Sequence, residues 1–340
     1  MEKMDKEDIE FKKKITQDRR NAKVSECIWG ENEDNSCQGK IVKAHSLQRS
    51  KILNKISDNG IIKTLEIILL NKVPEVIFDD VGIKKFSTFS GFCQKHDKDI
   101  FQPIEDYNFN NTLSHKYIYA YRSASKEYHT KKESIHISDN LISELKLNKE
   151  NQDVIFQQEY KMMQDGMSVI ELGDICKYMQ GNMTKAELHG LTHYSYILKK
   201  EYPMACSSCF IPYYDFNGKS LFSDTEKNIM SLNCEEDVRN TKYLFVNIFP
   251  ENGKTNILIS HFKNMRKKYK FLSKLEKLNE EQLTLSISNM IINYIENIAF
   301  SPKYIKNEFS KEEINLIKKC FIHNIYDTNS FENTKIQLFK

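Results

Sequence analysis

The segments CIWGENEDNSCQGKIVKAH (residues 27–45) and TFSGFCQKHD (residues 88–97) decide how the N-terminal part of this 340-residue chain folds. Three of the eight cysteines and two of the nine histidines lie between residues 27 and 105. Two pairs of soft metal ligands stand out, Cys27 with Cys37 and Cys93 with His96. This arrangement predicts a zinc site assembled from two separate elements of the fold.

Tetrahedral coordination explains why these four residues suit one metal ion. Structural zinc takes four Cys or His ligands, at about 2.3 Å from sulfur and about 2.0 Å from nitrogen. The polar residues 30–36 favour a loop between Cys27 and Cys37. Cys93 and His96 are three residues apart, so at the start of a helix they lie on one face. The alternative is four unrelated residues, because cysteines are also common in protein cores.

The order of these motifs resembles that of HNH-type nucleases, which have a ββα-metal fold framed by zinc in a treble clef. The resemblance covers residues 23–105 only. It implies that His45, at the end of the first strand, is the general base that activates water. It also implies that Asp97, directly after the last zinc ligand, holds the catalytic metal where the family usually has histidine. Thr88 stands at the family's central asparagine, and Ala44 stands where an acidic ligand often lies.

The residue types suit this chemistry on physical grounds. Phosphodiester hydrolysis needs a deprotonated water and a cation at the leaving oxygen. An unperturbed histidine titrates near pH 6.5, so His45 can accept a proton at neutral pH. A carboxylate such as Asp97 suits magnesium or manganese, which prefer oxygen ligands. Arg49 and Lys51 follow His45 closely and are candidates for contacting a phosphate, although lone basic residues are more often simply exposed.

Composition limits the broader classes of function. Hydrophobic residues make up 40% of the chain, which is enough for packed cores and argues against global disorder. The net charge is only +3, so nucleic-acid binding requires a local basic face. We find no apolar run of about 18 residues and no signal peptide, so we expect no membrane span. The unevenly spaced cysteines do not suggest a secreted disulfide framework, and the cytoplasm is the expected location.

Outside the zinc module, we expect a charged helix over residues 1–22 and a larger part over residues 106–340. Within the module, Gly60 is expected to close a helix, and two strands are inserted between the motif halves. Residues 106–200 look mostly helical, with a break at Gly181 and a further helix over residues 188–202 that carries His189 and His193 on one face. A zinc protease would need glutamate at position 190, which is glycine, so we reject that interpretation.

Alternating patterns and Asn-Gly turns predict an antiparallel sheet over about residues 203–262. Cys206 and Cys209 are expected to be ordinary strand residues. Helices should follow over residues 264–323, the last one opened by a capping box of Ser310 and Glu313. The start of this region has the densest basic cluster in the chain, which is either a nucleic-acid contact face or a solvated helix face. Its members are Lys263, Arg266, Lys267, Lys268 and Lys270.

We therefore expect an α+β fold, with an N-terminal zinc-framed ββα-metal module joined to a larger mixed domain that has an antiparallel sheet and flanking helices. The predicted function is metal-dependent hydrolysis of nucleic acid, with duplex DNA as substrate, structural zinc, and Mg or Mn as catalytic cofactor. Such modules often serve in bacterial defence against foreign DNA, an analogy at the level of the family. The larger part would select substrate, sense a signal, or bind a second copy or another subunit. The alternative is a non-catalytic zinc module that binds nucleic acid or protein.

Overall fold

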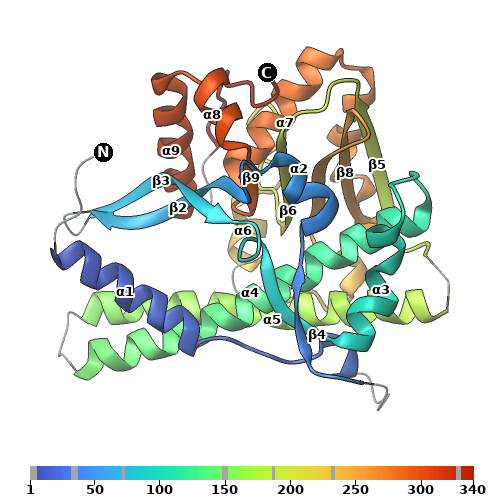
Figure 1. Cartoon of the computed structure of the whole chain (residues 1–340). Helices are drawn as coiled ribbons and strands as arrows, with labels where there is room; N and C mark the ends of the chain where they lie inside the picture. Colours follow the sequence, from blue (N-terminus) through green and yellow to red (C-terminus); the bar gives the residue numbers. More distant parts are fainter. Residues whose placement is uncertain are drawn as a thin grey trace.

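A seven-stranded sheet, in which every neighbouring pair is antiparallel, runs through the molecule in the order β3-β2-β9-β6-β7-β8-β5 (Figure 1). The computed structural model describes residues 6–31, 37–70, 73–147, 152–185, 188–230, 234–326 and 331–340. The strands are β2 (Ile61–Leu70), β3 (Val73–Gly82), β5 (Leu191–Leu198), β6 (Met204–Phe210), β7 (Leu244–Glu251), β8 (Lys254–Phe262) and β9 (Ile298–Phe300). A separate two-stranded sheet pairs β1 (Ile41–His45) with β4 (Thr88–Cys93). The expected α+β fold with antiparallel sheets and flanking helices is confirmed.

A hairpin of β7 and β8 lies between β6 and the edge strand β5 in the large sheet. Asn252 and Gly253 have φ angles of 53° and 76° at its tip. Such a two-residue turn matches the twist of the flanking strands and explains the Asn-Gly pair. Nearly every side chain of both strands is buried, as expected of strands covered on both faces. The sequence prediction of this hairpin is correct.

The predicted helix over residues 188–202 is wrong, because most of this segment forms a strand at one edge of the sheet. Residues 191–198 form β5, which pairs with β8 in unbroken register from Leu191 opposite Phe262 to Leu198 opposite Thr255. His189 precedes the strand, so His189 and His193 do not share a helix face. The backbone N–H and C=O groups of this segment form hydrogen bonds with β8, which lies about 60 residues further along the chain. No local sequence pattern reveals such a distant partner.

The opposite edge of the large sheet is formed by β2 and β3, the two strands inserted between the ligand pairs of the zinc module. Strand β2 pairs with β3 along its whole length and with β9 at Lys63 opposite Phe300. The Thr64 hydroxyl donates a hydrogen bond to the Ile298 carbonyl at 2.7 Å. The two inserted strands therefore extend the large sheet, although they lie within residues 23–105. Gly60 does not close a helix; it stands with Asn59 in the turn that opens β2, at a φ of 77°.

Two long helices, α4 (Leu113–Leu147) and α5 (Gln152–Thr184), pack against each other and cover one face of the sheet (Figure 1). The expected break at Gly181 is wrong, because α5 continues to Thr184. The helix is held there from outside, since the Gln180 side chain donates hydrogen bonds to the Ile28 carbonyl and the Tyr121 hydroxyl. Tertiary contacts therefore override the low helix propensity of glycine.

The sheet separates two hydrophobic cores. The core on the α4 side includes Cys209, Phe245 and Phe249. The core on the opposite side includes Cys206 and the side chains of β7 that alternate with Phe245 and Phe249. Because successive side chains on a strand point to opposite faces, residues 206 and 209 enter different cores. Both cysteines are buried strand residues, as expected.

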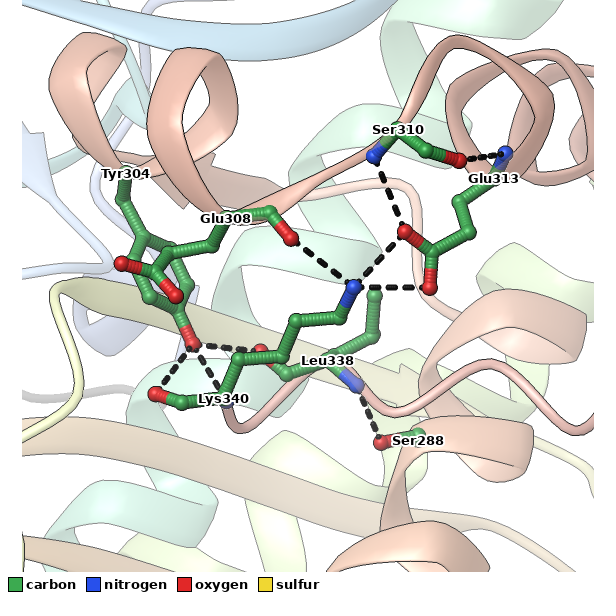
Figure 2. A network of polar contacts seen from close by, with 7 residues as sticks. All are labelled: Ser288, Tyr304, Glu308, Ser310, Glu313, Leu338 and Lys340. Atoms are coloured by element: carbon green, nitrogen blue, oxygen red, sulfur yellow. Dashed lines mark hydrogen bonds and ion pairs between the residues drawn. The ribbon is translucent and has the colours of Figure 1, made fainter.

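Helices α7 (Glu280–Tyr294), α8 (Pro302–Glu308) and α9 (Lys311–Tyr326) lie on this opposite side. The predicted capping box opens α9: the Ser310 backbone N–H donates to the Glu313 carboxylate at 2.9 Å, and the Glu313 N–H donates to the Ser310 hydroxyl at 3.2 Å. Figure 2 shows how the same carboxylate, together with the Glu308 carbonyl, accepts from the Lys340 ammonium group. The Tyr304 hydroxyl donates to the Leu338 carbonyl and accepts from the Lys340 N–H. These bonds anchor residues 338–340 against α8 and α9.

The remaining elements are short, apart from the N-terminal helix and α3. The basic segment that starts at residue 263, where a helix was expected, forms two 3-10 segments, η4 (Lys263–Arg266) and η5 (Lys270–Lys277). Sixteen residues form α1, whose Arg19 lies 3.6 Å from the Glu66 carboxylate of β2. The bounds are α1 (Lys6–Asn21), η1 (Ile28–Glu31), η2 (Arg49–Leu53), α2 (Asn54–Ile56), α3 (Gln94–Asp106), α6 (Asp224–Met230), η3 (Val238–Asn240), η4 (Lys263–Arg266) and η5 (Lys270–Lys277). Residues 1–5 of the expected first helix lie outside the described residues.

Candidate metal centre and hydrolytic site

The four predicted zinc ligands come together at the start of α3. The His96 Nδ1 atom lies 3.3 Å from the sulfur of Cys27, 3.7 Å from that of Cys37 and 3.4 Å from that of Cys93. All four ligand atoms lie within 4.8 Å of one another. In a tetrahedral zinc site, bond lengths of about 2.3 and 2.0 Å place sulfur and nitrogen about 3.5 Å apart. The cluster therefore has the composition and the spacing to bind one zinc ion.

Backbone pairing delivers these ligands from distant parts of the chain. The β1–β4 register sets Ile41 opposite Cys93, and the Gln94 N–H donates to the Lys40 carbonyl at 3.0 Å. Cys93 is the residue before α3, and His96 lies in the first turn. Gly39 turns the loop at a φ of 76°, where an added Cβ would lie 3.0 Å from the Gln94 side chain. The loop can approach the helix this closely because it has glycine there.

The charges at the cluster favour a cation. Burial raises the pKa of the Cys37 thiol to about 12, and the neighbouring Cys27 and Cys93 add to the rise. Burial also opposes ionisation of Cys93, but hydrogen bonds, first from the His96 backbone N–H and then from Gln38, lower its pKa on balance. Several thiolates this close repel one another, and a bound divalent cation removes that penalty. Among the residues that the structure describes, this is the one group of three or more His, Cys, Asp or Glu side chains placed to share a metal ion.

His45 ends β1 directly opposite Thr88 in β4. Its Nε2 lies 3.2 Å from the Ile83 carbonyl oxygen, which can only accept, so Nε2 must carry the proton. The Nδ1 atom of the neutral ring is then an acceptor. Burial lowers the pKa of His45; the Ile83 hydrogen bond works against this, while Arg122 and Arg49 reinforce it. At neutral pH the imidazole is therefore uncharged, with one proton on Nε2, and able to take a second proton at Nδ1.

Asp97 lies in the first turn of α3, beside the zinc ligand His96. Its Oδ1 atom is buried and has no hydrogen-bond partner among the described residues. Burial raises the pKa of Asp97; Arg122 acts against this rise, and Glu105 adds to it. An orphaned carboxylate oxygen suits a hard cation such as Mg²⁺ or Mn²⁺, which binds one or two carboxylates and keeps several waters.

Arg122 and Glu105 are the site residues that the sequence did not single out. The Arg122 guanidinium is 1% exposed, forms an ion pair with the Glu105 carboxylate and lies 4.5 Å from the centre of the Phe101 ring. Both charged groups perturb the pKa of His45 and that of Asp97, so they lie near both side chains. The only sequence signal was helical spacing, since positions 97, 101 and 105 share one face of α3.

Thr88 and Ala44 occupy the positions at which the chain departs from the family pattern. The Thr88 hydroxyl donates to the Lys85 carbonyl at 3.0 Å, so it closes the turn before β4. The Ala44 side chain is buried among the core of the module and contributes no metal ligand. Arg49 is exposed, whereas the buried Lys51 Nζ atom has no partner among the described residues.

The predicted basic cluster is mostly exposed but is not one helix face. Lys263, Arg266, Lys267 and Lys270 are exposed, while Lys268 binds the Glu226 carboxylate at 2.7 Å and stacks over the Phe222 ring. Four of the five basic side chains are therefore accessible to a phosphate-bearing partner.

Comparison of the chain with protein-family models, curated proteins and solved structures gives no match. No helix in the described parts of the chain has the length and apolar character to cross a membrane. None of the eight cysteines, all of which lie in the described parts of the chain, forms a disulfide.

Proposed function

We propose that the chain is a metal-dependent HNH-like nuclease that hydrolyses phosphodiester bonds in nucleic acid. One observation carries the proposal: the His45 imidazole lies at the end of β1, in the two-stranded sheet beside the cluster of Cys27, Cys37, Cys93 and His96, and its Nε2 atom faces the Ile83 carbonyl. A neutral histidine held in one tautomer on a rigid element is a suitable general base.

The residues divide the work as follows. His45 accepts a proton from the attacking water at Nδ1. Asp97 would hold Mg²⁺ or Mn²⁺, which supplies positive charge for the developing phosphate oxyanion. Arg49, exposed and close enough to His45 to lower its pKa, would bind a phosphate oxygen of the substrate. The zinc, through its four ligands, would keep β1, β4 and α3 in register, and Thr88 would support the turn opposite His45.

A second candidate is a zinc module that binds nucleic acid or protein without cleaving it. It is favoured by Ala44, whose buried methyl group leaves Asp97 without a second carboxylate from β1. A site with one carboxylate holds Mg²⁺ weakly until substrate phosphates add oxygen ligands. The two candidates therefore differ in whether bound nucleic acid is cut when Mg²⁺ or Mn²⁺ is added.

The proposed partner is duplex DNA, and the exposed basic side chains of the 263–270 segment support this choice. The lack of disulfides among the described cysteines supports the reducing cytoplasm as the proposed location. Defence of a bacterial cell against foreign DNA is the role that the family analogy suggests. Residues 106–340 would select the substrate or bind a second copy or another subunit.

A nicking assay separates the candidates. Supercoiled plasmid, linear duplex, single-stranded DNA and RNA are incubated with the full chain in Mg²⁺, in Mn²⁺ and in EDTA. The proposal predicts nicked and then linear plasmid in the metal-containing reactions only. DNA binding without cleavage in either metal would leave the non-catalytic module as the correct description.

A further inference from the structure

A cavity of about 760 Å³ lies between the large sheet and α4, apart from the zinc centre. Its walls come from α1, β2, α4, α5, β6 and the segment that follows α7. Cavities of 300–1,000 Å³ are typical of small-molecule sites. Its lining combines apolar and aromatic side chains with charged and hydroxyl groups.

One side of the cavity is rich in cationic and hydroxyl groups. Lys126 and Lys131 reach it from α4 and Lys161 from α5, beside the hydroxyls of Thr130 and Ser134. Lys131 and Lys161 both bind the Asp165 carboxylate, at 2.9 and 2.8 Å, and the Ser134 hydroxyl donates to the same group. The ammonium groups of Lys131 and Lys161 and the Ser134 hydroxyl therefore gather around one carboxylate on this side of the cavity.

Lys126 adds a third ammonium group that has no carboxylate partner. Its Nζ atom donates to the Thr130 hydroxyl at 2.7 Å, and no acidic side chain of the described residues lies within ion-pair distance of it. Burial lowers the pKa of Lys126, and the more distant carboxylates of Glu127, Glu133 and Glu296 act against that shift. An ammonium group that is partly buried without a direct ion pair is costly, and an anionic ligand in contact with it would reduce the cost.

Acidic and aromatic groups line the rest of the cavity. Glu127 and Glu296 lie on its wall, and neither forms an ion pair with another described residue. The rings of Tyr213, Tyr243 and Tyr294 lie there too. A carboxylate accepts hydrogen bonds from ribose hydroxyls or ring amino groups, and aromatic side chains stack on heterocyclic bases.

We propose that this cavity is a binding site for a nucleotide. Its phosphate lies against Lys126, Lys131 and Ser134, and its ribose and base lie against Glu127, Glu296 and the tyrosine rings. The phosphate would bind the cationic side of the cavity, and the base and sugar would bind the carboxylates and aromatic rings. A nucleotide therefore interacts with both parts of the lining, whereas inorganic phosphate interacts with only one. A dipeptide or polyamine would leave part of this lining unused.

One residue of the cavity lining also contacts the residues beside the two-stranded sheet of β1 and β4, which carries His45. The Asn297 amide lines the cavity and donates hydrogen bonds to the Ser46 hydroxyl at 2.9 Å and the Ser87 hydroxyl at 3.0 Å. Ser46 directly follows His45, and Ser87 directly precedes Thr88. Only the Asn297 side chain therefore separates a nucleotide in the cavity from the residues next to His45 and Thr88.

Calorimetric titration of the full chain tests the binding site independently of nuclease activity. The probes are the adenosine and guanosine mono- and triphosphates, the unphosphorylated nucleosides, inorganic phosphate and pyrophosphate. At least one nucleotide is expected to bind with a Kd below about 100 µM, and more tightly than its nucleoside or either inorganic anion. Lys126→Met, which keeps the length of the buried stem, should weaken it about 10- to 100-fold, as expected for a lost hydrogen bond to a charged group.

Lys146→Met is the matched control, because Lys146 lies on the same helix but binds Glu159 at the surface. Glu127→Gln is a second variant, which should weaken nucleotide binding without weakening any phosphate binding, because it removes a negative charge near Lys126. The proposal is overturned if no nucleotide binds with a Kd below about 100 µM, if inorganic phosphate or pyrophosphate binds as tightly, or if Lys126→Met and Lys146→Met have equal effects.

Discussion

Cys93→Ser tests the metal centre with a change of one atom. Zinc binding contributes about 10–16 kcal/mol in small zinc domains, so an equal share for each of four ligands is about 2.5–4 kcal/mol. Since tenfold in affinity corresponds to about 1.4 kcal/mol, the variant should bind zinc about 10²- to 10³-fold more weakly. Cys93 is 1% exposed at the junction of β4 and α3, so a serine hydroxyl there also gains no water in compensation.

The assay combines zinc content by elemental analysis with hydrogen exchange. Wild-type protein should hold about one zinc per chain, and Cys93→Ser should lose it during dialysis against a chelator. Exchange should accelerate in residues 37–45 and 88–97, while β7 and β8 keep more of their protection, because one face of these strands packs in the core that contains none of the ligand-bearing segments. Cys320→Ser is the control, since Cys320 is 2% exposed but lies in α9, away from the cluster. Zinc retained by Cys93→Ser, or a wild-type protein that folds fully without zinc, would refute the reasoning.

Three further predictions concern the C-terminal anchor and the basic segment. Tyr304→Phe leaves the Leu338 carbonyl and the Lys340 N–H without their shared hydroxyl, so urea unfolding should show a loss of about 1–3 kcal/mol, whereas Tyr107→Phe at an exposed position should change little. The hydrogen bond from Lys340 leads the causes that lower the pKa of Glu313; stability from this group is therefore present above pH 4.5 and is lost as pH falls through the lower folded pKa. The difference in unfolding free energy between wild type and Glu313→Gln should accordingly shrink on acidification, and a constant difference would exclude this linkage. Charge reversal at Arg266 and Lys267 should reduce the slope of log affinity for duplex DNA against log salt by about 0.9 per lost phosphate contact; an unchanged slope and affinity would exclude this segment from the interface.

The elements predicted correctly from sequence have local signals. The ligand pairs around the zinc centre have a fixed spacing, the hairpin of β7 and β8 has an Asn-Gly turn, and the Ser310–Glu313 box opens a helix with the expected pair of hydrogen bonds. In each case the residues that make the contact lie within a few positions of one another, or share one chemical type that few other roles require.

The incorrect predictions involve partners that are distant in sequence. Residues 188–202 contain the helix-like spacing of His189 and His193, yet pairing with β8 determines that residues 191–198 are extended. Gly181 suggests a break, but Gln180 is held by Ile28 and Tyr121 from two other segments. The inserted strands join the large sheet through Lys63 and Phe300, which are separated by most of the chain. Local propensity cannot indicate any of these contacts.

The site itself was predictable in part. The two ligand pairs indicated the cluster of Cys27, Cys37, Cys93 and His96, whereas the roles of His45 as a base and Asp97 as an oxygen ligand stay predictions. The buried pair of Arg122 and Glu105 was not predicted, because a buried arginine on a long helix has the same sequence signature as a solvated one. Its position near both predicted residues came only from the packing of α4 against α3.

The most direct test of the central claim is the single-turnover rate of plasmid cleavage by His45→Ala in saturating Mg²⁺ or Mn²⁺. Loss of a general base typically costs about 10²–10⁴ in rate, so cleavage should fall by at least that lower factor while zinc content and folding stay at wild-type values. His136→Ala, at an exposed position of α4, should cleave at the wild-type rate. Cleavage by His45→Ala at the wild-type rate, or an equal loss in His136→Ala, would contradict the assignment of His45 as the base.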